Sequence, residues 1–178
     1  MSKLKELTWE NHQKAERTEM ARKMLKGMEP AEYHRYLYNQ YVQYAALESI
    51  ANTKGVLVGI ENIARATYIL ADVSELEKEY NIQRDVDLLC PVVAEYVGHV
   101  MELDEDGILA HMYVRHFGDM YGGQMIKKRN PGSGKMYEFE NVEELKTTVR
   151  SRLKDEMADE ANRCFEFAMQ LFEELNDE

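Results

Sequence analysis

The chain has few residues that cross-link or interrupt a fold. Among 178 residues there are two cysteines, Cys90 and Cys164, and no Cys-x-x-Cys pair. Two isolated cysteines cannot build a disulfide framework, so we interpret both as small reduced core thiols, which favours a cytoplasmic location. Only three prolines and ten glycines occur, which leaves long segments free to form continuous regular structure.

Long apolar runs and excess positive charge are also absent. No apolar segment approaches the ~20 residues that span a bilayer, and the N-terminus has no secretory apolar core. The 33 acidic residues outnumber the 22 basic ones, and the formal net charge is −11. Such a surface repels nucleic acids and anionic membranes at long range, so we expect neither as a partner. We expect a soluble monomer.

What the chain does have is helical periodicity. Apolar residues recur at i, i+3, i+4 and i+7, and few segments alternate with period two. The pattern predicts an all-α fold in a single domain that spans residues 1–178. The expected helices cover residues 3–26, 30–52, 61–72, 91–103, 108–128 and 141–175, the last interrupted around 155–159. A further short helix is expected to open at the capping box of Ser74 to Glu77.

One expected helix contains an unusual cluster of glycines. Gly118, Gly122 and Gly123 lie within six residues of a segment that is otherwise apolar and aromatic. Each glycine in a helix interior costs about 1 kcal/mol relative to alanine. The cluster suggests a kink or something flat pressed against the backbone, while close helix–helix packing or a loop between two helices are the structural alternatives that stay open.

The five histidines form no zinc-protease motif of the H-E-x-x-H type. We interpret His34 and His99 as structural histidines. His12 differs because Lys5, seven residues before it, and Glu16, four residues after it, share its helix face. A carboxylate one turn away is the usual support of a metal-bound imidazole, although the same pattern is common on ordinary helices.

Two further groups of side chains have structural and functional interpretations. Lys146 and Arg150 form an i, i+4 basic pair, which is either a solvated face or a clamp for carboxylates or phosphates. A series of tyrosines in the second expected helix is interpreted as packing at the core and its rim. Its members are Tyr33, Tyr36, Tyr38, Tyr41 and Tyr44.

Three segments together resemble the haem oxygenase family. Residues 113–124, Tyr-Val-Arg-His-Phe-Gly-Asp-Met-Tyr-Gly-Gly-Gln, resemble the family's distal-helix signature, an aromatic residue and an arginine followed by G-D-x-x-G-G-Q. Residues 10–16, Glu-Asn-His-Gln-Lys-Ala-Glu, resemble the segment that carries the proximal histidine. Residues 170–175 resemble the family's last helix, and the resemblance follows nearly the whole chain in order.

The resemblance implies a multi-helix fold with haem held between a proximal and a distal helix. His12 would be the iron ligand and Glu16 its hydrogen-bonding partner. The positions that match residues holding the haem propionates are Lys5, Tyr113, Lys146 and Arg150. The distal positions are Gly118, Gly122 and Gly123, whose backbone leaves room for dioxygen, Asp119, which organises a water network, and Tyr44 and Arg115, which extend it.

The resemblance also implies an oxidoreductase of bilin biosynthesis that cleaves haem with O2 and electrons to biliverdin, carbon monoxide and ferrous iron. The lack of a membrane tail resembles the soluble cyanobacterial and plastid branch, including a phage-borne version of it. That branch takes electrons from ferredoxin, and its biliverdin passes to a bilin reductase. Because ferredoxins are acidic like this chain, docking needs a local basic patch. The candidates are Lys127, Lys128, Arg129, Arg152 and Lys154.

Three positions depart from the family pattern. Trp9 stands where a second propionate-binding lysine is frequent, and Ala168 where some members have a network asparagine. His116 replaces an aromatic residue, and we expect it to point away from the iron.

Three other functions stay open beside the enzyme. A haem-binding protein that stores or senses haem would need His12 and the basic clamp but not Asp119, so the presence of Asp119 favours the enzyme. A thiaminase-like helical protein would need a reactive cysteine or carboxylate site, and no reactive-cysteine context is evident. An inert helical interaction protein would lose helix stability to the three glycines and gain no function from them.

Overall fold

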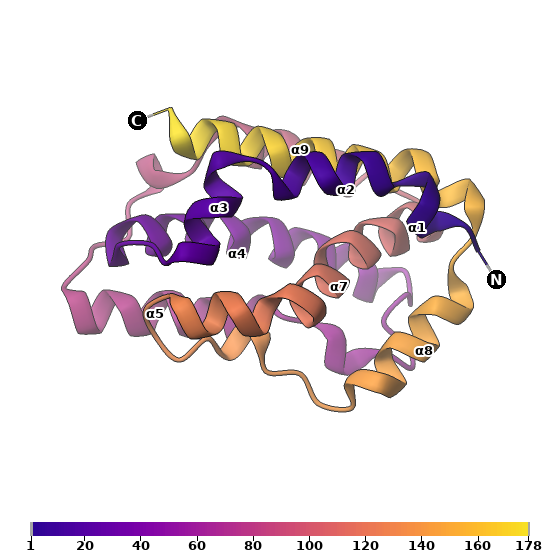
Figure 1. Cartoon of the computed structure of the whole chain (residues 1–178). Helices are drawn as coiled ribbons and strands as arrows, with labels where there is room; N and C mark the ends of the chain where they lie inside the picture. The colour runs from indigo at the N-terminus through magenta and orange to yellow at the C-terminus, as the bar shows by residue number, and fades with distance from the viewer. Residues whose placement is uncertain (1, 178) are drawn as a thin grey trace.

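The computed structural model describes residues 2–177, which form α-helices and short 3₁₀ helices and no β-strand. The all-α prediction is therefore confirmed. Figure 1 shows the α-helices in chain order. They are α1 (Leu4–Leu7), α2 (Trp9–Glu16), α3 (Glu19–Lys26), α4 (Pro30–Thr53), α5 (Ala66–Tyr80), α6 (Pro91–Val100), α7 (Glu105–Arg129), α8 (Val142–Arg152) and α9 (Ala158–Asn176). The 3₁₀ helices are η1 (Glu61–Ile63), η2 (Val86–Leu88), η3 (Lys135–Tyr137) and η4 (Asp155–Met157).

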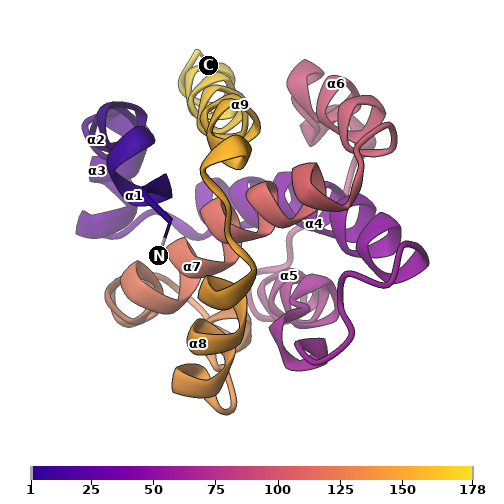
Figure 2. The same ribbon diagram turned by 90° about the vertical axis from the view of Figure 1, so that its right-hand side faces the viewer.

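Helix α7 occupies the centre of the molecule. It packs against α3, α4, α8 and α9, while α5 and α6 pack on the other sides of α4. Figure 2 shows α7 crossing the middle of the fold, with α9 above it and α8 below it. The N-terminal helices α2 and α3 lie against the C-terminal helix α9. The first and last segments of the chain therefore build one side of the domain together.

The core is built largely on α4. Pro30 occupies the first turn of this helix, where its missing N–H costs nothing. The tyrosines of α4 pack as predicted, because Tyr33, Tyr36, Tyr38 and Tyr44 are at most 8% exposed and Tyr41 is partly buried against the same core. The thiols of Cys90 and Cys164 are both buried, and no disulfide links them.

The prediction of one helix over residues 3–26 is wrong, because two threonines end and restart it. The Thr8 hydroxyl donates to the Leu4 carbonyl oxygen at 2.8 Å, between α1 and α2. Thr18 caps α3, where its hydroxyl oxygen accepts from the Ala21 N–H at 3.2 Å. Such local side-chain bonds compete with helical bonds and favour a helix end. Gly27 ends α3 as expected, with φ of 106°.

The prediction of a helix ending at residue 72 and a new one opening at Ser74 is also wrong. Helix α5 runs unbroken through Ser74, and residues 61–63 form the separate η1. The start of α5 is instead capped from another helix. Both carboxylate oxygens of Glu48 on α4 accept backbone N–H groups, from Arg65 at 2.6 Å and Ala66 at 2.9 Å. Glu48 lies 17 positions before Arg65, so this cap leaves no local sequence motif from which the start of α5 could be predicted.

The remaining boundaries follow the sequence closely. Asp104 caps α7, where its carboxylate accepts from the Gly107 N–H at 2.8 Å. The glycine cluster does not end α7, although the helix axis changes direction along its length (Figure 1). The expected interruption near 155–159 is the segment of η4 between α8 and α9. Among the described residues, no helix is long and apolar enough to cross a membrane.

Candidate functional site

A cleft of about 1030 Å³ opens between the N-terminal helices, α7 and α8. Its walls come from four regions of the chain that lie far apart in sequence. The lining residues are Ser2, Leu4, Lys5, Thr8, Trp9, His12, Tyr113, Val114, Phe117, Gly118, Tyr121, Thr147, Arg150, Ser151, Leu153 and Phe165. Lys5, His12, Tyr113, Gly118 and Arg150 were all predicted from the sequence as site residues, and the fold brings them to this one cleft.

His12 stands in the wall formed by α2. Its Nε2 lies 2.7 Å from Glu16 Oε1, and the two side chains are 41% and 66% exposed. The indole of Trp9 stacks on the imidazole, with ring centroids 5.3 Å apart and planes inclined by 11°. The ring of Phe165 on α9 meets the imidazole edge-on at 5.7 Å. The imidazole is therefore oriented by three contacts, of which the sequence indicated only Glu16.

The opposite wall is a ladder of aromatic rings on α7. Tyr113, Phe117 and Tyr121 are spaced four residues apart, and their ring centroids are separated by 5.3 and 6.0 Å. Gly118 lies beside Phe117, and a Cβ atom at its position would meet no other group within 4 Å. The backbone at Gly118 thus faces open space in the cleft.

The three glycines of α7 differ in their surroundings. Gly122 is exposed, is not a lining residue, and also has open space at its Cβ position. Gly123 is buried, and a Cβ atom there would lie 2.2 Å from Cδ1 of Tyr137. The absence of a side chain at Gly123 is therefore a packing requirement of Tyr137, and only Gly118 lines the cleft.

The basic side of the cleft is organised by Tyr121. The Arg150 guanidinium donates to the Tyr121 hydroxyl, and the Lys146 ammonium lies 3.9 Å from the centroid of the Tyr121 ring. Lys146 is not itself a lining residue, and it also lies 3.7 Å from Glu143. Tyr121 was not among the site residues predicted from the sequence, although its spacing from Phe117 and Tyr113 is the i, i+4 signal of a shared helix face.

Asp119 lies behind this wall and is partly buried. Its Oδ2 accepts a hydrogen bond from the Tyr44 hydroxyl at 2.7 Å. Burial raises the pKa of Asp119 to about 6, although His116, the Tyr44 hydrogen bond, Arg115 and Arg65 favour the carboxylate. Burial likewise raises the pKa of Tyr44 well above 10, so Tyr44 stays protonated. The predicted pair of Asp119 and Tyr44 is thus in direct contact.

Arg115 continues the polar chain away from the cleft. It is 7% exposed, and each of its guanidinium nitrogens has a hydrogen-bond partner. Nε donates to the Tyr96 hydroxyl at 2.9 Å. Nη1 donates to Gln40 Oε1 at 3.1 Å, and Nη2 donates to Gln43 Oε1 at 2.7 Å. The guanidinium carbon also lies 5.4 Å from the centroid of the Tyr44 ring. Arg115 therefore contacts Tyr44 through its ring and hydrogen-bonds to other buried side chains.

His116 points away from the cleft, as expected. It is fully buried, and its Nε2 lies 2.8 Å from Glu48 Oε2 on α4. Its ring packs on Tyr44, with ring centroids 5.1 Å apart. Glu48 therefore joins α4, α7 and the start of α5 through a single carboxylate.

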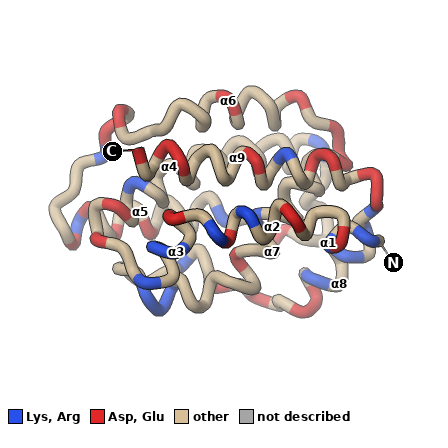
Figure 3. The backbone as a smooth tube through the Cα atoms, turned by 45° about the horizontal axis from the view of Figure 1, so that its top comes forward, with Lys and Arg blue, Asp and Glu red and all other residues tan. Residues whose placement is uncertain are grey.

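The prediction of one basic patch is wrong. Lys154 pairs with Asp106 in the first turn of α7, at 3.2 Å, whereas Lys127, Lys128 and Arg129 lie in its last turn. At ~1.5 Å per residue these ends of α7 are roughly 30 Å apart. Figure 3 shows basic segments spread over several elements, and those beside α3 lie apart from those between the N-terminus and α8. Lys127 is paired with Glu138, and Arg152 donates to the carbonyl oxygens of Val56 and Val58.

Comparisons with known proteins agree with this fold. The family model described as "Heme oxygenase" matches residues 1–174. Haem oxygenase 2 of Macaca fascicularis is 29% identical over 210 residues, which cover 97% of this chain but only 64% of the relative's length. The crystal structure of haem oxygenase-1 from the cyanobacterium Synechocystis in complex with haem is 25% identical, with a TM-score of 0.78 over 97% of this chain and 90% of that chain. The haem oxygenase of Leptospira interrogans is 26% identical, with a TM-score of 0.79 over 95% of this chain and 96% of that chain.

The fold and the match over nearly the whole chain define the class of protein. The chain belongs to the haem oxygenase family.

Proposed function

We propose that this chain binds haem in the cleft and acts as a haem oxygenase, which opens the ring to biliverdin and releases carbon monoxide and ferrous iron. The observation that carries this proposal is the placement of His12, Gly118 and Arg150 on different walls of one cleft. An imidazole, an open stretch of backbone and a cation are what a flat apolar ligand with a central iron and an anionic edge requires.

The lining residues fit haem in size and polarity. A volume of about 1030 Å³ is at the upper end of the range for ligand pockets. His12 is the iron ligand in this proposal. Its Nε2 contacts Glu16, so rotation of the imidazole exchanges the two nitrogens, with one binding iron and the other donating to the Glu16 carboxylate. Val114 and Phe117 contribute apolar surface.

The basic groups of the cleft are assigned to the propionates. Lys5 and Arg150 line it, and the Tyr113 hydroxyl offers a further donor. Lys146 acts from behind Tyr121, whose ring it covers. The Trp9 side chain carries no positive charge and instead stacks on the His12 ring. Propionate binding in this chain is therefore assigned to Lys5 and to Lys146 and Arg150 on α8.

When bound, haem supplies the iron that activates O2. The chain's own part is to leave space at Gly118 and to deliver protons. Asp119, with its pKa near 6, can hold or release a proton close to neutral pH, and Tyr44 donates to its carboxylate. We assign Asp119 to the protonation of the distal side through ordered water, with Tyr44 and Arg115 fixing its orientation.

The electron donor in this proposal is a soluble acidic protein of the ferredoxin type. Lys154 is the docking residue that we favour, because it follows Leu153, which lines the cleft, whereas neither Lys128 nor its chain neighbours line it. A cytoplasmic monomer that passes biliverdin to a bilin reductase completes the proposal.

The test begins with one equivalent of hemin and the visible spectrum of the purified protein. Ascorbate, or a ferredoxin reducing system, is then added in air. A Soret band that decays while a broad red biliverdin band grows is the expected result, and the biliverdin isomer reports how haem lies in the cleft. No Soret change on adding hemin would overturn the whole proposal.

Non-catalytic haem binding is the second candidate function. It is favoured by the fact that His12, Lys5 and Arg150 line the cleft directly whereas Asp119 does not. A Soret band that persists after reduction in air would establish it in place of the enzyme. Asp119→Asn separates the two functions further, because it should leave hemin affinity nearly unchanged and slow biliverdin formation only in an enzyme.

A further inference from the structure

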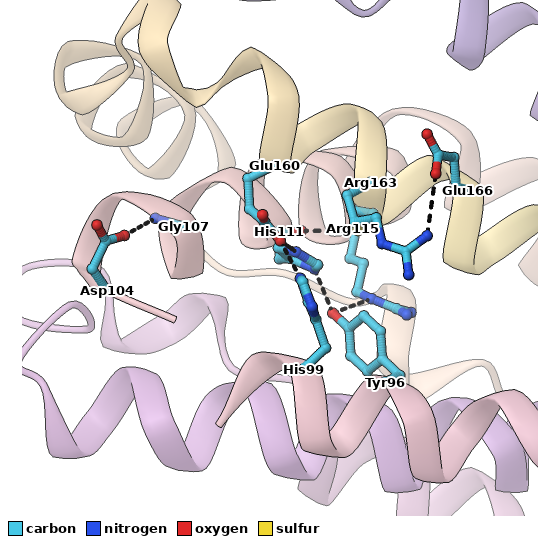
Figure 4. A network of polar contacts seen from close by, with 10 residues as sticks. Tyr96, His99, Asp104, Gly107, His111, Arg115, Glu160, Arg163 and Glu166 are labelled. Atoms are coloured by element: carbon cyan, nitrogen blue, oxygen red, sulfur yellow. Dashed lines mark hydrogen bonds and ion pairs between the residues drawn. The ribbon is translucent and has the colours of Figure 1, made fainter. Parts of the chain in front are cut away.

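Three helices bring two imidazoles and a carboxylate together away from the cleft. His99 lies in the last turn of α6, His111 in α7 and Glu160 in the first turn of α9. Figure 4 shows both imidazoles directed at the Glu160 carboxylate. His111 Nε2 lies 2.9 Å from Glu160 Oε1, His99 Nε2 contacts the same oxygen, and the three ligand atoms all lie within 4.8 Å of one another.

The cluster has the hydrogen-bonded support that metal-binding histidines have in proteins. His111 Nδ1 lies 2.9 Å from the Tyr96 hydroxyl, and that hydroxyl accepts from Arg115 Nε at 2.9 Å. The His111 imidazole is therefore fixed by a buried partner on the side that faces away from Glu160.

The cluster is also accessible from solvent. The His111 side chain is fully buried, but those of His99 and Glu160 are 30% and 26% exposed. An ion can thus reach the three ligand atoms without opening the core. Ligands ~2.1 Å from a tetrahedral Zn²⁺ are roughly 3.4 Å apart, so a small outward movement of the two imidazoles suffices to admit an ion.

We propose that His99, His111 and Glu160 form a binding site for a divalent transition-metal ion that accepts nitrogen and oxygen ligands, such as Zn²⁺. Three protein ligands leave a fourth position for water. The bound ion links the end of α6, the middle of α7 and the start of α9. The site is separate from the cleft and does not depend on haem, since none of its three ligands lines the cleft.

The experiment uses the full chain without haem, treated with EDTA and then exchanged into chelator-free buffer. Calorimetric titration with Zn²⁺ should give one site per chain, and Co²⁺ should give the visible bands of a four-coordinate ion. At Zn²⁺ a hundredfold above its dissociation constant, the midpoint of thermal unfolding should rise by roughly 5–10 °C.

Two variants of part-exposed ligands test the assignment without disturbing the buried His111. His99→Ala and Glu160→Gln should each weaken Zn²⁺ binding at least tenfold and abolish the thermal shift. Glu166→Gln, an exposed position two turns along α9, and His12→Ala, in the cleft, should bind Zn²⁺ as the unaltered chain does. The proposal is overturned if the unaltered chain binds no Zn²⁺, or if His12→Ala loses the ion and the two ligand variants retain it. Circular dichroism confirms that each variant is folded.

Discussion

The indole of Trp9 and the imidazole of His12 lie parallel, 5.3 Å apart between ring centroids. Trp9 is the only tryptophan of the chain, so its fluorescence reports on the cleft alone. We expect hemin to quench that fluorescence in a saturable manner at one equivalent. The stoichiometry is checked against the Soret titration of the same sample. Quenching that rises linearly with hemin and never saturates would contradict the placement of haem beside His12.

Trp9 should also control the strength of ligand binding. Trp9→Ala removes the stacked surface from His12, and we expect hemin affinity to fall by about three- to tenfold, which corresponds to the ~0.5–1.5 kcal/mol of an aromatic pair. Trp9→Phe retains a ring and should restore most of the affinity. The comparison is made by Soret titration, and equal affinity in all three proteins would show that the stacking is incidental.

Asp119 should make stability depend on pH in a defined direction. Burial raises its pKa in the folded protein to about 6, above the value near 3.9 of an unfolded chain. Between these values the folded state binds the extra proton, so the contribution of Asp119 to stability falls as pH rises from 4 to 6 and is constant above 6. Asp119→Asn should equal the unaltered protein at pH 4 and exceed it by about 1–3 kcal/mol at pH 7.

Urea unfolding at pH 4, 5, 6 and 7 checks this difference. The charged and titratable groups around Asp119 are common to both proteins and cancel in the comparison. They are Tyr36 and Tyr44 on α4, Arg65 before α5, Arg115 and His116 on α7, and Tyr137 on η3. A stability difference that does not change with pH would show that folding does not shift the pKa of Asp119.

The three glycines of α7 should respond differently to alanine. Gly118→Ala and Gly122→Ala meet open space, so each should gain about 1 kcal/mol from helix propensity. Gly123→Ala places a methyl group 2.2 Å from the buried Tyr137 ring and should cost about 1–3 kcal/mol. Gly118→Ala should also lower hemin affinity, while Gly122→Ala serves as its control. Urea midpoints and Soret titrations measure both effects, and identical behaviour of Gly118 and Gly123 would contradict the structure.

Arg115 should be needed as an arginine and not only as a cation. Its five N–H groups reach three acceptors, whereas a lysine is a single point donor. Arg115→Lys leaves at least one of these buried acceptors unpaired and should cost about 2–4 kcal/mol. Arg163→Lys on the exposed face of α9 is the matched control and should change stability by less than ~0.5 kcal/mol. A similar small change in both variants would refute the network.

Electron transfer should be slowed by charge reversal at Lys154 and not by charge reversal at Lys128. Lys154→Glu lies beside the cleft and Lys128→Glu at the far end. We expect the first to slow reduction by ferredoxin at low salt several-fold and the second to have little effect, because steering acts near the docking surface. Reduction by ascorbate is the control. Equal loss with both donors would show that Lys154 acts on the cleft and not on docking.

Residues that share one face of a helix could be predicted from their spacing in the sequence. The shared helix face of Lys5, His12 and Glu16 and the glycine cluster of α7 follow from spacing alone, and the resemblance to a known family added Asp119 and Tyr44. The helix ends at Thr8 and Thr18 could not be predicted, because a threonine inside an apolar pattern is compatible with a helix.

Contacts between helices that are distant in sequence could not be predicted either, for a different reason. Glu48 caps α5 from another helix, and Phe165 reaches His12 from α9. His99, His111 and Glu160 come from three helices. No local pattern encodes such meetings, because they arise only when the helices pack.

The docking of α2 on α9 has a consequence for the order in which the cleft is completed during synthesis. Helix α2 has eight residues and no fully buried side chain, and it packs mainly on α9. Helices this short are unstable alone in water. The segment that bears His12 leaves the ribosome before α9 and has no surface to pack on until residues 158–176 emerge. The wall that contains His12 is thus among the last parts to form, and under the proposed function haem would bind at His12 only after α9 has been made.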